Sequence, residues 1–231
     1  MVTLLTESRG KVALMARGAR KSKKRFAGAL EPYCLIEAEL AMGRGEVGRL
    51  AEARVVRAFP GLLTSLEKIG VAAAGLEVVR ELVPDHEPPD ERLLPTVVRF
   101  LERLEETDPA GIEGLRIAFD LRLLALTGHS PNLETCGHCG TPAPEGKAAL
   151  FSPRAGAIVC RACGGAPYKL GGRLRMAMIR AGTRTWDQPD PDLGPEARRP
   201  LEELLEHLLS RRLAGEDLVT QVRAITRRSE P

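Results

Sequence analysis

The apolar positions in the first 60 residues recur mostly at every second residue, which is the period of a β-strand. Residues 2–5 and 12–15 flank a turn signal at 7–10, which predicts a hairpin, and residues 50–59 predict a further strand. Residues 32–40 alternate best, with one apolar face made by Cys34, Ile36, Ala38 and Leu40. Cys34 is therefore interpreted as a small core residue. Short antiparallel strands with long basic loops are typical of a small β-barrel.

The period changes to that of a helix after residue 63. Thr64 and Glu67 form a capping-box pattern, so we expect a helix to begin there. Its apolar stripe is expected to consist of Leu66, Ile69, Ala73, Leu76 and Val79. A second helix is expected within residues 90–106, where Pro95 must occupy the first turn. Residues 113–127 are apolar nearly all round, which predicts a helix in the middle of a bundle.

Two more helices are predicted in the C-terminal third of the chain. The first covers residues 170–184, and a longer one begins between Pro195 and Pro200 and ends near Leu213. The tail beyond it carries basic residues that are either a frayed end or a minor second phosphate contact: Arg223, Arg227 and Arg228. The patterns together predict an α+β protein, with a β-barrel first and a helical domain after it.

Two Cys-x-x-Cys pairs, twenty residues apart, interrupt the helical part: Cys136 with Cys139, and Cys160 with Cys163. This spacing is a strong zinc signature, because each pair offers two thiolates to one tetrahedral ion. Residues 148–152 and 157–160 read as strands of a short hairpin that joins the pairs.

We predict one structural Zn²⁺ held by all four cysteines. A catalytic zinc usually keeps one coordination position open, whereas four thiolates close the shell. His138 is an alternative fourth ligand, although a solvent-facing position fits it better. Two disulfides are disfavoured, because the N-terminus lacks a signal peptide and cysteines of a protein that is not exported stay reduced. A thioredoxin-like redox pair is also disfavoured, since no βαβ pattern surrounds either Cys-x-x-Cys.

The net charge of +3 is distributed unevenly along the 231 residues. Residues 1–60 carry 12 basic and 6 acidic side chains, whereas residues 61–130 carry 7 basic and 13 acidic ones. A basic N-terminal domain indicates a polyanionic partner. The candidate phosphate-binding residues lie in or near one loop that contains no acid: Lys11, Arg17, Arg20, Lys21, Lys23, Lys24 and Arg25. A solvated, mobile loop is the alternative interpretation.

Binding by this loop is expected to be mainly electrostatic and indifferent to base sequence. Lysine and arginine that neutralise phosphates release counterions, so such binding weakens steeply with salt. Single strands normally add base stacking on aromatic rings. The first domain offers few rings for this purpose, namely Phe26, Tyr33 and Phe59.

Several functional classes are disfavoured by what the sequence lacks. No run of about eighteen apolar residues is present, so no membrane partner is expected. The sequence suggests neither a pair of carboxylates in an apolar pocket nor a Ser/His/Asp array. We therefore do not expect an enzyme, and we expect a cytoplasmic protein.

Several local motifs resemble the RecO family of bacterial recombination mediators. The matching stretches are residues 10–20, the Gly-Ala-Leu-Glu-Pro at 28–32, the Phe-Asp-Leu-Arg-Leu-Leu at 119–124, and the Phe-Ser-Pro-x-x-Gly at 151–156, together with both Cys-x-x-Cys pairs. These motifs occur in the same order and cover most of the chain.

The resemblance implies an N-terminal OB-fold barrel, a helical domain and an inserted four-cysteine zinc knuckle. It implies binding to single- and double-stranded DNA, annealing of complementary strands, and help in loading RecA onto DNA coated with SSB. The implied partners are RecR and the acidic, apolar C-terminal tail of SSB, with RecA served indirectly. The implied location is the bacterial nucleoid, and no bond chemistry belongs to the family.

On this basis we expect an OB-fold DNA-binding domain over 1–60 and the first part of a helical domain over 61–135. The zinc knuckle is expected over 136–164, and the second part of the helical domain over 165–231. Family members usually carry a further strand before residues 2–5, where this chain starts. The expected barrel therefore lacks its first strand and has an unpaired edge.

Two other functions remain open at this point. One is a zinc-knuckle adaptor that binds proteins but not DNA directly, whose basic loop is incidental. The other is a zinc-dependent nucleic-acid enzyme, which requires an open coordination position on the metal.

Overall fold

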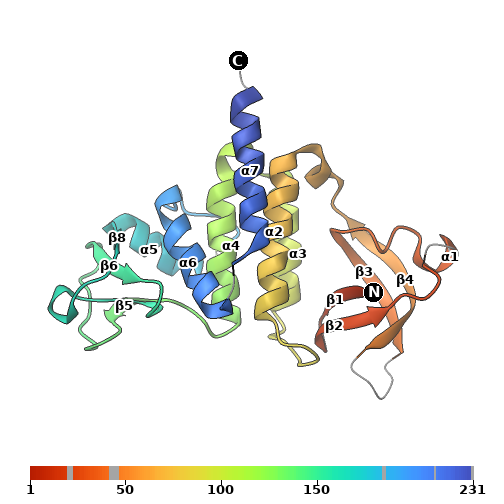
Figure 1. Ribbon diagram of the computed structural model, residues 1–231, viewed down its shortest axis with the longest axis horizontal. Helices are drawn as coiled ribbons and strands as arrows, with labels where there is room; N and C mark the ends of the chain where they lie inside the picture. Colours follow the sequence, from red (N-terminus) through yellow and green to blue (C-terminus); the bar gives the residue numbers. More distant parts are fainter. Residues whose placement is uncertain (20–22, 42–46, 184–185, 211, 230–231) are drawn as a thin grey trace.

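A central group of helices separates two small β-sheets that lie at opposite ends of the molecule (Figure 1). The computed structural model describes residues 1–19, 23–41, 47–183, 186–210 and 212–229. The first sheet belongs to the N-terminal part of the chain, and the second contains the four-cysteine segment. The expected α+β composition is confirmed.

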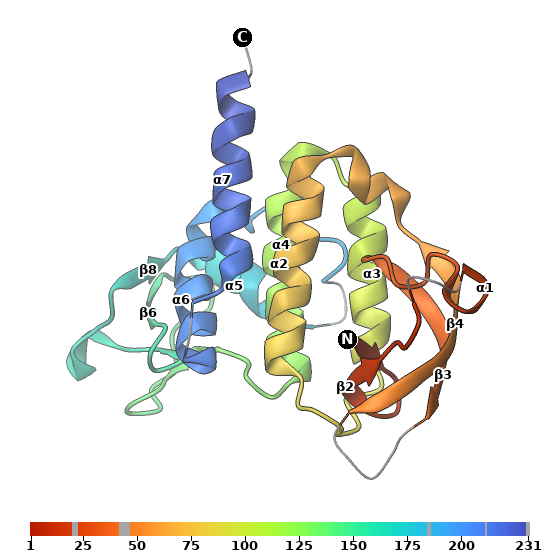
Figure 2. The same cartoon turned by 45° about the vertical axis from the view of Figure 1, so that its right-hand side comes forward.

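The N-terminal sheet contains four strands in the order β1-β2-β4-β3. The strands are β1 (Val2–Thr6), β2 (Gly10–Met15), β3 (Cys34–Ala41) and β4 (Gly48–Ala58). The β1–β2 and β3–β4 pairs are antiparallel, whereas β2 and β4 run parallel through Leu14 and Met15. This arrangement leaves β1 and β3 as the two outer strands of the curved sheet (Figure 2).

The alternation of apolar residues predicted this sheet correctly. The expected hairpin forms between β1 and β2, with Gly10 at a φ of +61°. Every second residue of β2 is buried, including Val12, and Leu50 of β4 is buried in the same alternating pattern. They form a small core that the buried ring of Phe26 completes. Phe26 ends the short helix α1 (Lys23–Phe26), which interrupts the basic loop.

The main hydrophobic core lies among the helices. The helices that contribute to it include α2 (Leu66–Leu82), α3 (Leu93–Glu106), α4 (Ile112–Leu126) and α7 (Ala214–Ser229). The 3-10 turn η1 (Pro60–Thr64) precedes α2, and η2 (Pro109–Gly111) lies between α3 and α4. Helix α4 packs against α2, α3 and α5 (Gly172–Ala181), and buried residues occur on all its sides, as its sequence predicts. Pro95 occupies the first turn of α3, also as predicted.

The centre of this core is aromatic. Phe100 of α3 stacks on Phe119 of α4, with ring centroids 3.9 Å apart and an interplanar angle of 8°. Trp186 lies beside Phe119 at a centroid distance of 5.8 Å. Helix α2 approaches closely because it presents Gly75 to the ring of Phe100, where a β-carbon would lie only 2.8 Å from a ring carbon.

The predicted start of α2 was wrong, and its predicted apolar stripe was right at Val79 and Leu76 but wrong at Leu66. Ser65, not Thr64, is the N-cap, and its hydroxyl accepts the backbone N–H of Lys68 at 3.4 Å. Leu66 was assigned to the buried stripe but is 62% exposed. Small residues are buried instead, including Gly70 beside Val219 of α7. A helix packed on more than one side buries its small residues, so the largest apolar side chains do not define its buried face.

The C-terminal region contains one more helix than predicted. Helix α6 (Arg198–Leu209) follows the 3-10 turn η4 (Pro195–Ala197) and ends at Ser210, whose φ is +52°. Helix α7 then begins anew. The backbone N–H of Gly215 at its start donates to the carboxylate of Glu77 at 2.6 Å, and the buried Val219 faces α2. The predicted frayed tail is therefore a packed helix through at least Val222.

The second sheet has the order β5-β7-β6-β8. Its strands are β5 (Asn132–Cys136), β6 (Ala149–Ser152), β7 (Ala157–Ile158) and β8 (Tyr168–Leu170). The β6–β7 hairpin confirms the one expected between the cysteine pairs. Strand β8 was not predicted; its residues were assigned partly to a helix, which begins only at Gly172. Among the described residues, no helix is both long enough and apolar enough to cross a membrane.

The aromatic stack provides a direct test of the core. Replacing Phe119 by Ala is expected to lower the free energy of unfolding by about 3–5 kcal/mol, because it removes a fully buried ring and leaves a cavity. Urea unfolding followed by the fluorescence of the single tryptophan, Trp186, measures this change. The matched control is Leu63→Ala, since Leu63 is 64% exposed and its loss should change stability by no more than about 0.5 kcal/mol. Equal effects of the two substitutions would contradict this account of the core.

Candidate functional site

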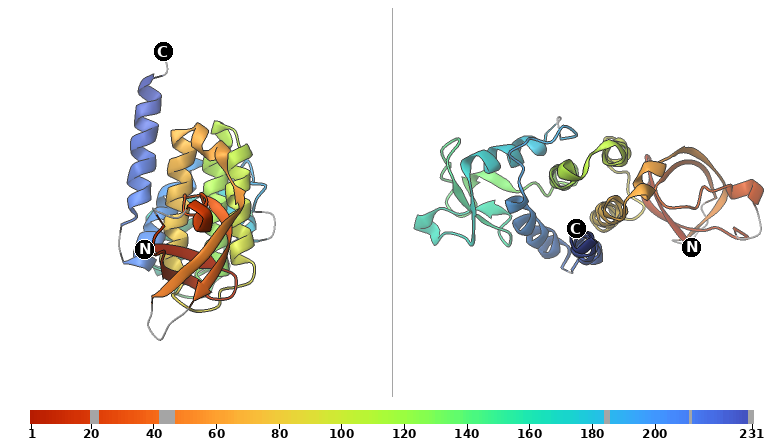
Figure 3. Two further views of the ribbon diagram at one scale, coloured as in Figure 1. Left: turned by 90° about the vertical axis from the view of Figure 1, so that its right-hand side faces the viewer. Right: turned by 90° about the horizontal axis from the view of Figure 1, so that it is seen from above.

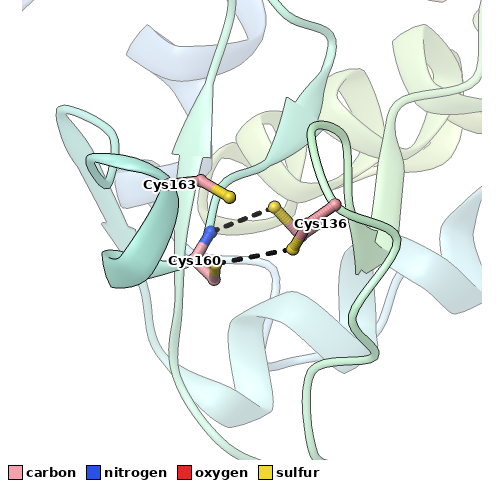
Figure 4. Close-up of side chains that lie close together, drawn as sticks. Cys136, Cys160 and Cys163 are labelled. Carbon is pink, nitrogen blue, oxygen red and sulfur yellow. Dashed lines mark hydrogen bonds between the residues drawn. The ribbon is translucent and has the colours of Figure 1, made fainter.

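The four cysteines of the two pairs converge on one point. Their sulfur atoms all lie within 4.8 Å of one another, which is close enough to hold a metal ion. Cys136 ends β5, Cys139 lies in the turn that follows, and Cys160 and Cys163 bracket the 3-10 turn η3 (Arg161–Cys163). Figure 4 shows Cys136 facing Cys160 and Cys163 across the gap between the two loops.

Backbone geometry produces this convergence. A glycine follows each Cys-x-x-Cys, and both adopt positive φ values, +71° at Gly140 and +100° at Gly164. Such values are accessible to glycine at little cost. The two loops are also joined directly, because the N–H of Gly137 donates to the carbonyl of Ile158 at 2.8 Å. The sheet therefore holds the two pairs in a fixed relative position.

Hydrogen bonds favour the thiolate form of two of the cysteines. The backbone N–H of Cys160 donates to the sulfur of Cys136 at 3.3 Å, and this bond is the main cause that lowers the pKa of Cys136 to about 6. The hydroxyl of Thr141, 3.2 Å from the sulfur of Cys139, lowers the pKa of that thiol. The nearby sulfur of Cys139 is the largest cause that raises the pKa of Cys163 to about 12.

Lowered pKa values for two thiols beside a raised pKa for a third are expected where four thiols share a site for a cation. Four sulfur atoms this close cannot all carry negative charge without a positive ion between them, because like charges raise each other's pKa. A divalent cation removes the repulsion and binds the deprotonated form of each thiol. The donor set, four sulfurs and nothing else, fits a soft or borderline metal ion rather than Ca²⁺ or Mg²⁺. His138 is exposed, as expected.

A buried arginine, which the sequence did not identify, fastens this module to the helices. Arg175 of α5 is 1% exposed, and its guanidinium donates to three backbone carbonyls of the module. The acceptors are the carbonyl of Leu133 at 2.6 Å, that of Pro144 at 2.5 Å and that of Lys147 at 3.0 Å. The helical period could have revealed this arginine, because Arg175 shares the predicted apolar face of its helix with Leu174 and Met178.

The expected phosphate-binding residues lie on the N-terminal domain at the other end of the molecule. Arg20 and Lys21 are outside the described residues, and for Lys23 and Lys24 only the backbone of α1 is described. Arg17 and Arg25 are exposed and adjacent, since Nη2 of Arg25 donates to the carbonyl of Arg17 at 3.0 Å.

The loop is anchored at its end. The guanidinium of Arg25 lies 5.1 Å from the centre of the Phe26 ring, and that ring is buried in the small core of the sheet. Lys11 is more restrained than the others: its ammonium group donates to the carbonyl of Arg80 at 2.6 Å and lies 3.5 Å from Asp85. To bind a phosphate, the ammonium group of Lys11 would have to give up its ion pair with Asp85.

The three aromatic residues of this domain do not form a stacking platform. Phe26 and Phe59 are 3% and 2% exposed, and the hydroxyl of Tyr33 donates to the carbonyl of Ile69 in α2. Cys34 is half-buried and donates weakly to the carbonyl of Pro32. With the rings occupied in packing, contact with a nucleic acid would depend on charge.

Arg223, one candidate for a minor phosphate contact, has acidic partners within the molecule. Its Nε donates to Glu67 of α2 at 2.9 Å, and its Nη1 pairs with Glu113 of α4. These acids raise the pKa of the Arg223 guanidinium against the opposing effect of burial. The residue therefore holds α7 against the bundle, and its acidic partners leave little of its charge for a phosphate.

The fold and the site define a class of protein: a mixed α+β chain with a cationic N-terminal domain and a four-cysteine cluster able to hold a metal ion. The family model described as Recombination protein O N terminal matches residues 1–59, and that described as Recombination protein O C terminal matches residues 63–220. The chain therefore belongs to the RecO family of recombination and DNA repair proteins, and the resemblance seen in its motifs is confirmed.

Curated relatives agree with this assignment. The DNA repair protein RecO of Anaeromyxobacter sp. (strain K) is 38% identical over 232 residues, which cover 96% of this chain and 89% of that protein. The protein of the same name from Myxococcus xanthus (strain DK1622) is 38% identical over 229 residues, covering 96% and 90%. That of Geobacter sulfurreducens is 36% identical over 169 residues, covering 72% and 68%.

The role of Arg175 can be tested by Arg175→Met, which keeps an apolar stem but removes every donor. Three carbonyls, one in a buried and two in partly buried hydrogen bonds, would lose their partner, at a cost of about 1–3 kcal/mol each. We expect the free energy of unfolding to fall by at least about 3 kcal/mol and hydrogen exchange to increase in β5 and in residues 144–147. The neighbouring Arg173→Met is the control, since Arg173 is exposed. Unchanged exchange in Arg175→Met would contradict the proposed fastening.

Proposed function

We propose that this protein is a non-catalytic, DNA-binding recombination mediator. In this proposal it binds single- and double-stranded DNA, anneals complementary strands, and helps load RecA onto single-stranded DNA coated with SSB during recombinational repair. The observation that carries the proposal is the membership of the RecO family over nearly the whole chain. The charge distribution and the four-cysteine cluster support it independently.

We propose an OB-fold barrel for the N-terminal domain. An OB fold is a five-stranded, partly open Greek-key barrel. The order β1-β2-β4-β3 with a parallel β2–β4 pair corresponds to such a barrel without one strand. A groove of about 1250 Å³ borders both outer strands and the adjoining faces of α2 and α3. A fifth strand between β1 and β3 would close the barrel there.

The proposed DNA contacts are the cations of the loop on this domain: Arg17, Arg20, Lys21, Lys23, Lys24 and Arg25, with Lys11 at their margin. Neutralising phosphates on two strands lowers the repulsion that opposes their pairing. Because the aromatic residues of the domain are buried, the binding should show little preference for base sequence.

Replacing Lys21, Lys23, Lys24 and Arg25 together by Ala tests this assignment. For single-stranded DNA the slope of log K against log salt should become less steep by about 0.7 for each phosphate that the variant no longer neutralises, so by up to about 3 in total. Affinity at low salt should fall accordingly, and annealing of SSB-coated oligonucleotides should slow. Fluorescence anisotropy across a salt series measures the slope.

The matched control removes four exposed arginines of the helical region that already have acidic partners: Arg92, Arg99, Arg180 and Arg212. It lowers the net charge equally, so any effect of overall charge appears in both variants. An unchanged salt slope in the loop variant would rule out this loop as the DNA contact. Absence of DNA binding by the wild-type protein would instead favour a protein-binding adaptor.

We propose that the metal is one structural Zn²⁺ bound by Cys136, Cys139, Cys160 and Cys163. Thiolates are preferred ligands of zinc, and four of them leave no position for a substrate. The ion would brace the two loops, whose turns already bring the sulfurs together. This role agrees with a protein that binds DNA without cleaving or joining it.

The zinc proposal predicts about one zinc per chain by elemental analysis of protein purified without added metal. Cys136→Ser should lose the metal and melt at lower temperature, because Cys136 is the buried member of the set. Cys34→Ser is the control, since Cys34 lies on β3, outside the cluster, and should retain the metal. A fully loaded Cys136→Ser variant would show that the ligand set is wrong, whereas X-ray absorption showing an open position would favour a metalloenzyme.

RecR and the C-terminal tail of SSB are the proposed protein partners. RecA is a proposed indirect partner, because the protein would help to load it onto DNA. The tail of SSB is acidic and apolar, so its site should combine an apolar groove with a basic rim. We place this site in the helical region and the protein in the cytoplasm, at the nucleoid.

A further inference from the structure

The cations of the helical bundle differ from those at the two ends of the molecule. Most arginines of the bundle have acidic partners, as between Arg99 and Asp187 or Arg223 and Glu67. Such pairs leave little charge for a ligand. At the N-terminal end, by contrast, the exposed Arg9, Arg17 and Arg49 have no ion-pair partner among the described residues.

The four-cysteine module, defined here as residues 132–173, shows the same excess. Its exposed cations are Lys147, Arg154, Arg161, Lys169 and Arg173. None of them has an ion-pair partner among the residues that the structure describes. The module contains only two acidic residues, Glu134 and Glu145. Five such cations against two acidic residues give this small unit an excess of positive charge.

Three of these cations gather at one edge of the second sheet. Strand β8 is an outer strand, and its Lys169 lies opposite Leu150 of β6. The same antiparallel register, extended beyond the strands, brings Lys147 opposite Gly172. The backbones do meet there: a β-carbon on Gly172 would lie 1.7 Å from the carbonyl oxygen of Gly146. The backbones at Lys147 and Arg173 therefore lie close together, and Lys169 precedes Arg173 along the same edge of the sheet.

This edge is held rigidly. Arg175 donates to the carbonyl of Lys147, which fixes the backbone of that residue to α5. Strand β8 pairs with β6, and its Leu170 is buried in the main core. A backbone fixed in this way loses less conformational entropy when its cations meet a ligand than one that must first be ordered.

We propose that the edge formed by Lys147, Lys169 and Arg173 is a second phosphate-binding surface, which holds a DNA strand independently of the N-terminal domain. The inference rests on the proposed function, which it deepens. The helical bundle separates the two surfaces, and Figure 3 shows them at opposite ends of the long axis. One protein molecule could then hold two strands at once, which gives annealing a direct physical basis.

Arg161 is left out of the proposed surface for a physical reason. A Zn²⁺ ion with four thiolates carries a formal charge of −2. Arg161 follows Cys160 directly, so its charge would partly offset that of the filled cluster. None of the three cations of the β8 edge belongs to either Cys-x-x-Cys turn, so they keep their charge for a ligand.

The test is a bridging experiment with full-length, zinc-loaded protein. A biotinylated 30-nucleotide oligonucleotide captures the protein on beads, and retention of a second, fluorescent, non-complementary oligonucleotide is measured over a salt series. The variant Lys147→Ala, Lys169→Ala, Arg173→Ala should bind the first oligonucleotide with the wild-type capacity. Its retention of the second should fall about tenfold or more, and the salt slope for the second should decrease by about 2.

The control removes three paired arginines, Arg92, Arg180 and Arg212, and should bridge like the wild type. Zinc content and melting temperature confirm that each variant is folded. If the triple variant melts early, Lys169→Glu alone replaces it, since Lys169 is exposed on an outer strand.

The outcomes separate the two proposals. Undiminished bridging by the variant, or no bridging by a wild-type protein that binds the first oligonucleotide, overturns the second surface and leaves the mediator proposal intact. Failure of the wild-type protein to bind any DNA overturns the mediator proposal itself. Loss of bridging in the paired-arginine control would attribute the effect to net charge and also overturn the inference.

Discussion

The rest of the structure depends on the need to bury helix α4 on every side. Apolar side chains cover its whole circumference, and even its Arg116 and Asp120 are buried and paired with each other at 2.9 Å. Exposing such a helix to water would cost more free energy than a small domain has to spare. Helices α2, α3 and α5 must therefore surround it, and these neighbours in turn carry the two sheets.

The two sheets are attached to this bundle in different ways. Arg175 of α5 fixes the four-cysteine module to the helices, because its guanidinium donates hydrogen bonds to three carbonyls of the module. The N-terminal sheet meets the bundle through several separate polar contacts, such as those of Lys11 with Arg80 and of Arg57 with Glu102. In both cases the connection leaves an outward surface on which some cations have no ion-pair partner among the described residues. A scaffold of this kind presents charge at its ends while its centre is internally compensated.

This distribution of charge would allow a protein with a net charge of only +3 to bind a polyanion, as the proposed function requires. Acidic residues are concentrated in the helical bundle, where arginines pair with them, so they do not screen the ends of the molecule. The four sulfurs add a local negative charge, which a bound divalent ion would reduce. The metal site and the charged surfaces are thus parts of one electrostatic arrangement rather than separate features.

The sequence alone determined whatever depends on local period or on spacing. Alternation identified the strands of the first sheet, an apolar circumference identified the central helix, and two Cys-x-x-Cys pairs identified the four-cysteine cluster that could hold a metal ion. The family motifs added the likeness to RecO. These features are encoded by neighbouring residues, so they can be read without knowing the fold.

Only the tertiary structure decided which side chains face which partner. The small residues of α2 are buried because helices approach it from several sides, which a one-sided stripe could not indicate. Strand β8 exists because β6 lies beside it, and α7 is stabilised by Glu77, Glu67 and Glu113, which are distant in sequence. The same holds for the cations: sequence shows where positive charge occurs, but whether an acid neutralises it depends on contacts between residues far apart in the chain.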